Sequence, residues 1–349
     1  MYKIGMYGGS FNPLHLGHLN DIFKAASMCE ELHIIISYND NREEIPMKIR
    51  YRWIYNSVKH IGNVFIHCIE DGASSKDDYN NSKRDYWKEG AIAIKNAIGK
   101  PIDVVFCGDD YKGTNRFESL YEDSHIEYFS RSEVPISSTE IRKNPYKYWD
   151  YIPNICKSFY NKKVLIVGGE SSGKSVLTQN LAIAFNTNFV SEVGRETCEY
   201  AGGEDFMIED DLIENLLKQR VNVDDALKTS NKVLFVDTDA LTTKFYLDFL
   251  MDRKSKTFKD VDNLADAINS LNNWDLVLFL EPTVKFIQDG TRSEEISYDR
   301  EKYSKQIKSL FDSCNIKYYS IDGDYLNRFE KSKQLVLDLL KIGGNENES

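Results

Sequence analysis

Two glycine-rich loops, each lying between an apolar run and a helical pattern, constrain what this chain can fold into. Residues 8–18 read Gly-Gly-Ser-Phe-Asn-Pro-Leu-His-Leu-Gly-His, and residues 168–175 read Gly-Gly-Glu-Ser-Ser-Gly-Lys-Ser. Glycines let a backbone approach a phosphate closely, and the N-terminus of the following helix attracts anions. Because the two loops differ in sequence, they predict two nucleotide sites of different chemical type and, with them, two consecutive reactions on one metabolite.

Short apolar runs alternate with longer helical patterns from end to end of the chain. In the first half the expected strands are 2–7, 32–38, 63–69, 102–107 and 126–130, and the expected helices are 16–29, 47–60 and 83–98. In the second half the expected strands are 163–167, 188–191, 232–236, 275–280 and 316–321, and the expected helices are 173–186, 207–228, 239–250, 259–272, 299–313 and 325–341. Such alternation predicts two α/β domains, each with a parallel sheet covered by helices. In these sheets ligands bind beyond the carboxyl ends of the strands, where both loops fall.

The bulk properties of the chain set further limits. Its 349 residues suit two domains, which we place at 1–158 and 159–342, with 343–349 as a disordered tail. The net charge of −11 disfavours loose binding to nucleic acid. The six cysteines include no Cys-x-x-Cys pair, which favours a reducing, cytoplasmic setting. No run approaches the roughly 20 apolar residues of a membrane helix.

The first loop carries two histidines, His15 and His18, which are three residues apart and therefore share one face of the following helix. They can donate hydrogen bonds to phosphate oxygens as charge develops at phosphorus. A distant Ser138-Thr139 pair is expected to cap a helix and hold phosphates, with Arg142 one turn later as a charge clamp. No covalent nucleophile is evident, so these residues predict direct attack on a nucleotide phosphate.

The second loop matches the P-loop pattern in full, with a strand before it and a helix after it. Its N–H groups are expected to wrap phosphates, while Lys174 reaches the β and γ oxygens and the Ser175 hydroxyl ligates Mg²⁺. Asp237, which ends the apolar run 233–236, is the candidate for the Mg²⁺ side. Asp239 could join it, or could simply cap the next helix.

A kinase for a small hydroxyl substrate also needs a carboxylate near that hydroxyl and positive charge over the transferred group. Glu192 ends a short strand and is the candidate for the first role, with Arg195 beside it. Arg292 and Arg300 are candidates for the second role. Arg292 ends the segment 288–292, with Arg300 a little later, and we interpret this region either as an arginine-carrying lid or as a plain exposed loop.

The first set of residues resembles the nucleotidyltransferase superfamily, and residues 45–53 and 86–87 resemble substrate segments of nicotinamide mononucleotide (NMN) adenylyltransferases. The two halves in this order resemble the NadR family, which joins an NMN adenylyltransferase to a ribosylnicotinamide kinase. The resemblance spans nearly the whole chain, and it implies a Rossmann-like nucleotidyltransferase domain followed by a P-loop kinase domain. Trp87 could then stack on nicotinamide or be an ordinary core residue. Asn39 is a second candidate for NMN.

The resemblance also implies two nucleotide sites and their ligands. For the first ATP it implies Gly8, Gly9, Ser10, Phe11, His15, His18, Ser138, Thr139 and Arg142. For the second it implies Gly168, Glu170, Ser171, Ser172, Gly173, Lys174, Ser175, Arg292 and Arg300, with Glu192, Arg195 and Asp237 for nicotinamide riboside and Ser175 and Asp237 for Mg²⁺. The implied small molecules are ATP, nicotinamide riboside, NMN and NAD.

The chain departs from the family pattern at several places, and three other functions stay open. Its first strand starts at Tyr2, so the helix-turn-helix domain of some members, and DNA binding, are not expected. Its segment 289–295 reads Asp-Gly-Thr-Arg-Ser-Glu-Glu, whereas the family usually has Asp-Gly-Leu-Arg-Ser-Leu-Gly. The alternatives are a protein with one active domain, a nucleotide-sensing regulator that contacts a partner such as a vitamin transporter, and an adenylyltransferase for another acceptor. Homo-oligomer formation stays open.

Overall fold

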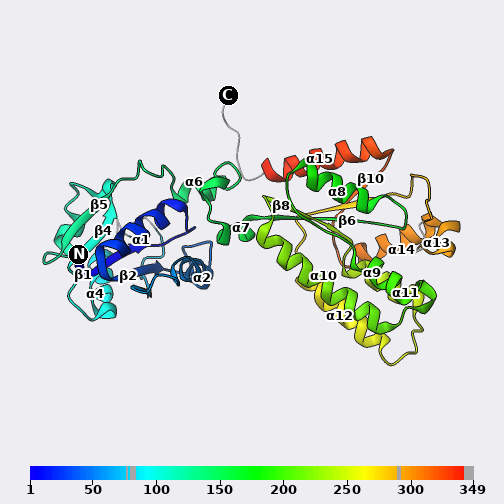
Figure 1. Cartoon of the computed structure of the whole chain (residues 1–349), viewed down its shortest axis with the longest axis horizontal. Coiled ribbons are helices and arrows are strands. Elements are labelled where there is room, and N and C mark those ends of the chain that lie inside the picture. Colours follow the sequence, from blue (N-terminus) through cyan, green and yellow to red (C-terminus); the bar gives the residue numbers. More distant parts are fainter. Residues whose placement is uncertain (76–77, 79–83, 289–291, 342–349) are drawn as a thin grey trace. The chain divides into compact units, whose positions relative to one another are not determined.

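The computed structural model describes residues 1–75, 78, 84–288 and 292–341. The chain divides into two compact units, Met1–Cys156 and Lys157–Ser349, with a division two residues before the expected domain boundary. The expected tail 343–349 and part of the segment 288–292 lie outside the described residues. Each unit is an α/β domain, as the alternation of apolar runs and helical patterns predicted (Figure 1).

The first unit is built around a parallel sheet whose strands follow the order β3-β2-β1-β4-β5 among the described residues. Its strands are β1 (Tyr2–Gly9), β2 (Cys29–Tyr38), β3 (Val64–Glu70), β4 (Val104–Gly108) and β5 (His125–Phe129). Its helices are α1 (Leu16–Met28), α2 (Met47–Val58), α4 (Tyr86–Ile98), α5 (Arg116–Leu120), α6 (Ser138–Lys143) and α7 (Asn154–Tyr160), the last of which crosses the division, with 3-10 turns η1 (Asp109–Tyr111) and η2 (Trp149–Tyr151).

The strand order of the first unit places its glycine-rich loop at a binding position. The chain leaves β1 toward β2 and β3 on one side, and it returns to β4 and β5 on the other side. The crevice between β1 and β4 is therefore the switch point at which α/β sheets bind ligands. Gly8 and Gly9 end β1 there, and Gly108 ends β4.

The second unit repeats this architecture with the strand order β10-β9-β6-β8-β7 in the part of the chain that the structure describes. Its strands are β6 (Lys162–Gly168), β7 (Phe189–Val190), β8 (Val233–Asp237), β9 (Leu276–Leu280) and β10 (Tyr319–Ile321). Its helices are α8 (Lys174–Ala184), α9 (Val193–Ala201), α10 (Glu209–Thr229), α11 (Ala240–Leu250), α12 (Phe258–Leu271), α13 (Glu294–Tyr298), α14 (Arg300–Ser313) and α15 (Tyr325–Lys341), with the 3-10 turn η3 (Glu204–Phe206). The P-loop follows the central strand β6.

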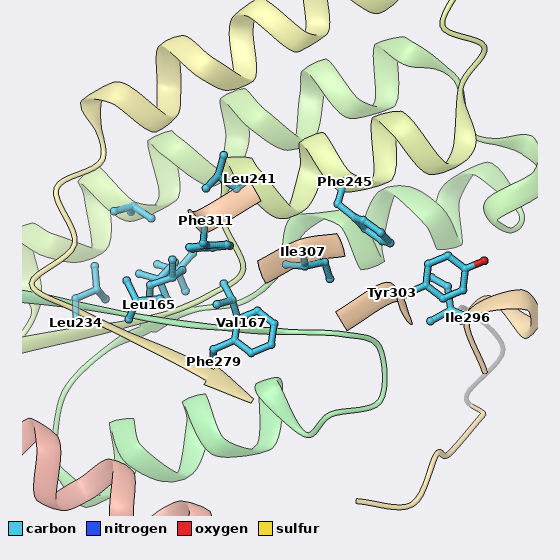
Figure 2. Packing of buried hydrophobic residues seen from close by; sticks show 14 residues of the cluster. Leu165, Val167, Leu234, Leu241, Phe245, Phe279, Ile296, Tyr303, Ile307 and Phe311 are labelled. Atoms are coloured by element: carbon cyan, nitrogen blue, oxygen red, sulfur yellow. The ribbon is translucent and has the colours of Figure 1, made fainter. Parts of the chain in front are cut away.

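The central strands of the second unit are apolar on both faces because helices cover both faces. Leu165 and Val167 of β6 pack toward α11 and α14, where Phe245 and Phe311 complete one cluster (Figure 2). The intervening residues of β6 belong to a second cluster with Leu177 of α8 and with α15. Because alternate residues of β6 pack on opposite faces of the sheet, β6 is held firmly at the point where the P-loop begins.

The sequence-based expectations missed several short helices. The helices α9 and α13 were not expected, and neither was α5. Each is short, with between five and nine residues, and short helices depend on tertiary packing more than on their own periodicity. Over the described residues, we find no helix that combines the length and the apolar character needed to cross a membrane.

Candidate nucleotide sites

The first loop presents His15 and His18 as a stacked pair at the start of α1. His15 is the N-cap of the helix, and its Nδ1 accepts a hydrogen bond from the His18 backbone N–H at 3.3 Å. The two rings lie 3.6 Å apart between centroids and 20° from parallel. The His18 ring also forms an edge-to-face pair with the buried ring of Phe11. The expected histidine pair is thus held on one side by the cap and on the other by an aromatic ring.

Both histidines are held in the neutral form. Burial, with a smaller effect from the charge of Arg131, lowers the pKa of His15 to about 4. Burial, the neighbouring His15 and Arg131 lower the pKa of His18 well below its usual value. A neutral imidazole can still donate one hydrogen bond to a phosphate oxygen, and an approaching triphosphate would favour the charged form.

The distant Ser-Ser-Thr segment packs against the first loop, as its expected role requires. The Ser138 hydroxyl donates to the Pro13 carbonyl at 2.9 Å. Arg142 donates to the Asn12 carbonyl and, at 3.1 Å, to the Thr139 hydroxyl. The two segments are therefore brought together across about 125 residues of chain.

The expected helix cap in this segment was placed one residue too late. The N-cap of α6 is Ser137, whose hydroxyl accepts from the Glu140 N–H at 3.2 Å while the Glu140 carboxylate bonds the Ser137 N–H at 2.9 Å. Ser138 and Thr139 are the first two helical residues, so their N–H groups belong to the free first turn. The Ser-x-x-Glu spacing of a capping box was the signal that identifies Ser137.

Arg131 is a residue of the first site that the sequence analysis missed. It follows β5, is half-exposed, and pairs with Asp110 at 2.7 Å. A Cβ on Gly108 would lie 2.7 Å from the Arg131 Nε and 2.4 Å from the Asp110 carboxylate, so a larger residue at the end of β4 would displace these two side chains. The charge of Arg131 is felt by both histidines, which places positive potential at the switch point.

Arg50 lies in segment 45–53, which resembles a substrate segment of NMN adenylyltransferases, and it bonds the first loop. Its guanidinium is fully buried and donates to the Ser10 carbonyl and, at 2.9 Å, to the Ile45 carbonyl. Glu43 lies 3.6 Å from its Nη2. Because the Arg50 guanidinium donates to backbone carbonyls, it stabilises the shape of the loop. Binding of a ligand is then left to the residues of the loop.

The two NMN candidates differ in what they contact. The Trp87 ring packs edge-on against Tyr111 and Phe117, and the Arg116 guanidinium covers it at 4.5 Å from the ring centroid. The Asn39 amide donates to the Asp71 carbonyl at 2.8 Å and accepts from the Asn41 N–H at 3.0 Å. Asn39 thus shapes the loop after β2, while Trp87 lies in an aromatic cluster.

The P-loop of the second unit is shaped by two glycines with positive φ. Gly168 has φ 148°, and a Cβ there would lie 2.5 Å from the Leu280 carbonyl. Gly173 has φ 88° and caps α8. The Lys174 ammonium is buried and donates to the Gly168 and Gly169 carbonyls at 3.1 and 3.2 Å, so it lies across the loop that it is expected to serve.

Three arginines surround the P-loop. Arg292 donates to the Ser171 hydroxyl at 2.7 Å, and Arg300 donates to the Ser171 carbonyl at 3.2 Å. Arg328, on α15, is fully buried and donates to the Ser172 carbonyl. Arg328 was not expected, because nothing in its sequence neighbourhood marks a partner 156 residues away.

The carboxylates behind the P-loop lie at the end of β8 and at the start of α9. Asp237 is buried and bonds the Ser175 hydroxyl, and burial together with the nearby Glu192 charge raises its pKa. Glu192 is the N-cap residue of α9. Asp239 caps α11 by accepting from the Thr242 N–H at 3.2 Å, which is one of its two expected roles, and it also lines the pocket beside the P-loop.

A pocket of about 860 Å³, including the space at its mouth, opens beside the P-loop. Its lining brings together six of the residues expected at the second site, namely Glu170, Ser171, Lys174, Glu192, Arg195 and Arg292. Glu204 adds a carboxylate that was not expected, and Tyr246 and Leu250 add apolar surface. A pocket of this size that is acidic and partly apolar suits a small organic cation that carries hydroxyl groups.

The fold and the two loops define a protein in which a nucleotidyltransferase-like unit precedes a P-loop unit. Residues 6–144 match the cytidylyltransferase-like family, and residues 163–328 match the AAA domain family. Over 352 residues the chain is 31% identical to the trifunctional NAD biosynthesis/regulator protein NadR of Salmonella typhimurium, covering 97% of this chain and 83% of that protein. The chain belongs to the NadR family.

Two solved structures share this fold over its whole length. A NadR protein in complex with NAD and AMP-PNP superimposes with a TM-score of 0.80 at 21% identity, over 100% of this chain and 99% of that one. A NadR protein in complex with NR gives a TM-score of 0.78 at 20% identity, over 99% and 97%. At these identities the likeness establishes the fold alone.

Proposed function

We propose that this chain makes NAD from nicotinamide riboside in two ATP-using steps, as a ribosylnicotinamide kinase (C-terminal unit) and a nicotinamide-nucleotide adenylyltransferase (N-terminal unit). One observation carries the proposal. The chain is similar over 97% of its length to a NAD biosynthesis protein, and in both units a phosphate loop follows the central strand. The solved relatives are named as complexes with NR, NAD and AMP-PNP, which are the acceptor, the final product and an ATP analogue of this scheme.

In the kinase step the 5′-hydroxyl of nicotinamide riboside attacks the γ-phosphorus of ATP, and ADP leaves. Lys174 and Arg292 neutralise the charge that spreads over the transferred group. Glu192 lies close enough to Asp237 to raise its pKa, so the two carboxylates are neighbours behind the P-loop. One of them, Glu192 by position, orients the hydroxyl and receives its proton. Arg195 lines the same pocket and contacts the riboside.

The donor set behind the P-loop fits Mg²⁺. Ser175 and Asp237 supply a hydroxyl and a carboxylate, which are hard oxygen ligands. The described residues contain no cluster of three or more His, Cys, Asp or Glu that could cage a metal by themselves. Mg²⁺ commonly binds through one or two protein oxygens together with phosphate oxygens and water, and when bound it neutralises the β- and γ-phosphates.

In the adenylyltransferase step the NMN phosphate attacks the α-phosphorus of a second ATP, and pyrophosphate leaves. His15 and His18 donate to the oxygens on which charge develops, and the free N–H groups at the starts of α1 and α6 hold the triphosphate. Arg142 sits on α6 beside the loop, and Arg131 adds a second positive charge that was not expected.

Paired variants test the two assignments separately. H18A is expected to abolish NAD formation from NMN and leave phosphorylation of nicotinamide riboside at the normal rate, whereas K174A is expected to do the reverse. Each half-reaction is measured by mass-resolved chromatography of the products, and the thermal melting curve of each variant checks that the mutated unit is folded. NAD formation that survives H18A rejects the first assignment, and a normal NMN yield from K174A rejects the second.

A further inference from the structure

Glu170 occupies one of the variable positions of the P-loop, yet its side chain is engaged on both oxygens by distant parts of the second unit. Oε1 accepts from the Tyr246 hydroxyl on α11 at 2.9 Å, and Oε2 accepts from the Ser293 backbone N–H at 2.9 Å. These donors lie 76 and 123 residues away in the chain. These two hydrogen bonds link the P-loop to α11 and to the start of α13, which loop geometry alone does not require.

Ser293, whose backbone N–H bonds Glu170, is next in the chain to Arg292. Ser293 is almost fully buried, caps α13 and is the chain neighbour of Arg292, whose guanidinium donates to the Ser171 hydroxyl at 2.7 Å. Arg300 fastens the same stretch of P-loop through the Glu170 and Ser171 carbonyls at 3.4 and 3.2 Å. The carboxylate of Glu170 thus fixes the backbone one residue away from Arg292, whose guanidinium bonds the P-loop.

Resting on the proposed kinase function, we propose that Glu170 is a positioning residue that holds Arg292 over the P-loop. Its carboxylate ties Tyr246 and Ser293 to the loop, so that the guanidinium is placed before ATP arrives. Preorganised charge contributes more to phosphoryl transfer than charge that must first be ordered. Glu170 acts through Arg292, without touching the reacting atoms.

The chemistry of the carboxylate supports this positioning role. Each oxygen accepts a hydrogen bond from a protein donor, so the carboxylate is held between Tyr246 and the Ser293 backbone. Burial raises the pKa of Glu170 to about 7, against the lowering effects of Tyr246, Lys174 and the Ser293 N–H. The neutral acid keeps one acceptor for Ser293, so the contact does not depend on one protonation state.

A double-mutant cycle in the full-length protein tests this inference through the rate of nicotinamide riboside phosphorylation. E170A is expected to lower kcat by about 10- to 100-fold, because small misplacements of a catalytic group cost that much. In an R292A background, already slowed by the loss of the arginine, E170A should cost less than about 2-fold, because the residue through which it acts is gone. E170Q should stay within about 3-fold of the wild type, since the amide can accept from Ser293 and donate to Tyr246.

Other outcomes overturn the inference. Full effects of E170A in the R292A background would mean that the two residues act independently, and E170Q as slow as E170A would mean that the carboxylate itself reacts. E301A, which changes an exposed glutamate on α14, is the matched control and should leave the rate unchanged. The thermal melting curve of E170A reports misfolding of the second unit. Wild-type protein without kinase activity would reject the proposed function, whereas a fully active E170A variant rejects only this inference.

Discussion

The buried histidine at the start of α1 should make the first unit sensitive to acid. His15 is 3% exposed, and its Nδ1 must be unprotonated to accept from the His18 N–H. Its pKa is about 4 in the folded state, against about 6.5 unfolded. The unfolded state therefore binds more protons between these values, and the free energy of unfolding falls as the pH decreases through this window. Above pH 6.5 the effect vanishes.

The size of the loss follows from the two pKa values. Between pH 7 and pH 5 the linkage relation gives a destabilisation of about 2 kcal/mol from His15 alone. Urea unfolding followed by tryptophan fluorescence measures it. In a W274F background the remaining tryptophans, Trp53, Trp87 and Trp149, all belong to the first unit. H15N keeps an acceptor at the N-cap and removes the titration.

The expected result is a loss between pH 7 and pH 5 that is about 2 kcal/mol larger in the parent than in H15N. His18 is present in both proteins, so its own effect largely cancels. H60N removes an exposed histidine near Phe23 and should keep the full pH dependence of the parent. Equal losses in the parent and H15N would show that His15 titrates normally, and would refute the argument from burial.

Three further predictions concern single positions. G168A should abolish kinase activity and lower the melting temperature of the second unit, because its Cβ would lie 2.5 Å from the Leu280 carbonyl at φ 148°; an unchanged melting curve would contradict this. R50A should cost about 2–5 kcal/mol in urea unfolding and slow the adenylyltransferase step, because buried carbonyls lose their donors; a loss below about 1 kcal/mol would show that the loop stands without it. D237N should abolish kinase activity while D239N, which keeps the helix cap, retains it; equal losses in rate assays would place Asp239 in the site.

The parts of the fold that the sequence predicted are those with a local signal. The strands were marked by apolar runs and the P-loop by its own spacing, and β6 and α8 lie within two residues of their expected bounds. The first-site helix cap was displaced by one residue because three consecutive hydroxyl residues, 137–139, can each cap a helix. Glu140 resolves that choice, because a capping box needs a Glu three residues after the cap, and Glu140 is three residues after Ser137.

The supporting arginines could not be predicted, for a physical reason. Arg50 bonds a carbonyl 40 residues away and Arg328 one 156 residues away, and both partners are backbone atoms without a side-chain signature. Arg131 depends on the pairing of β5 with β4, which brings it to Asp110 and to the histidines. Motifs locate the residues that touch a ligand, whereas the residues that hold those motifs in place are fixed by tertiary contacts.

The central claim is that the two units act in series on one metabolite. The most direct measurement is mass-resolved chromatography of the products that form over time from nicotinamide riboside, ATP and Mg²⁺ with the full-length protein. The account predicts that NMN rises first and then declines as NAD accumulates, with ADP and pyrophosphate as the other products. NMN that accumulates without NAD would contradict the adenylyltransferase assignment, and the absence of both NMN and NAD would contradict the kinase assignment.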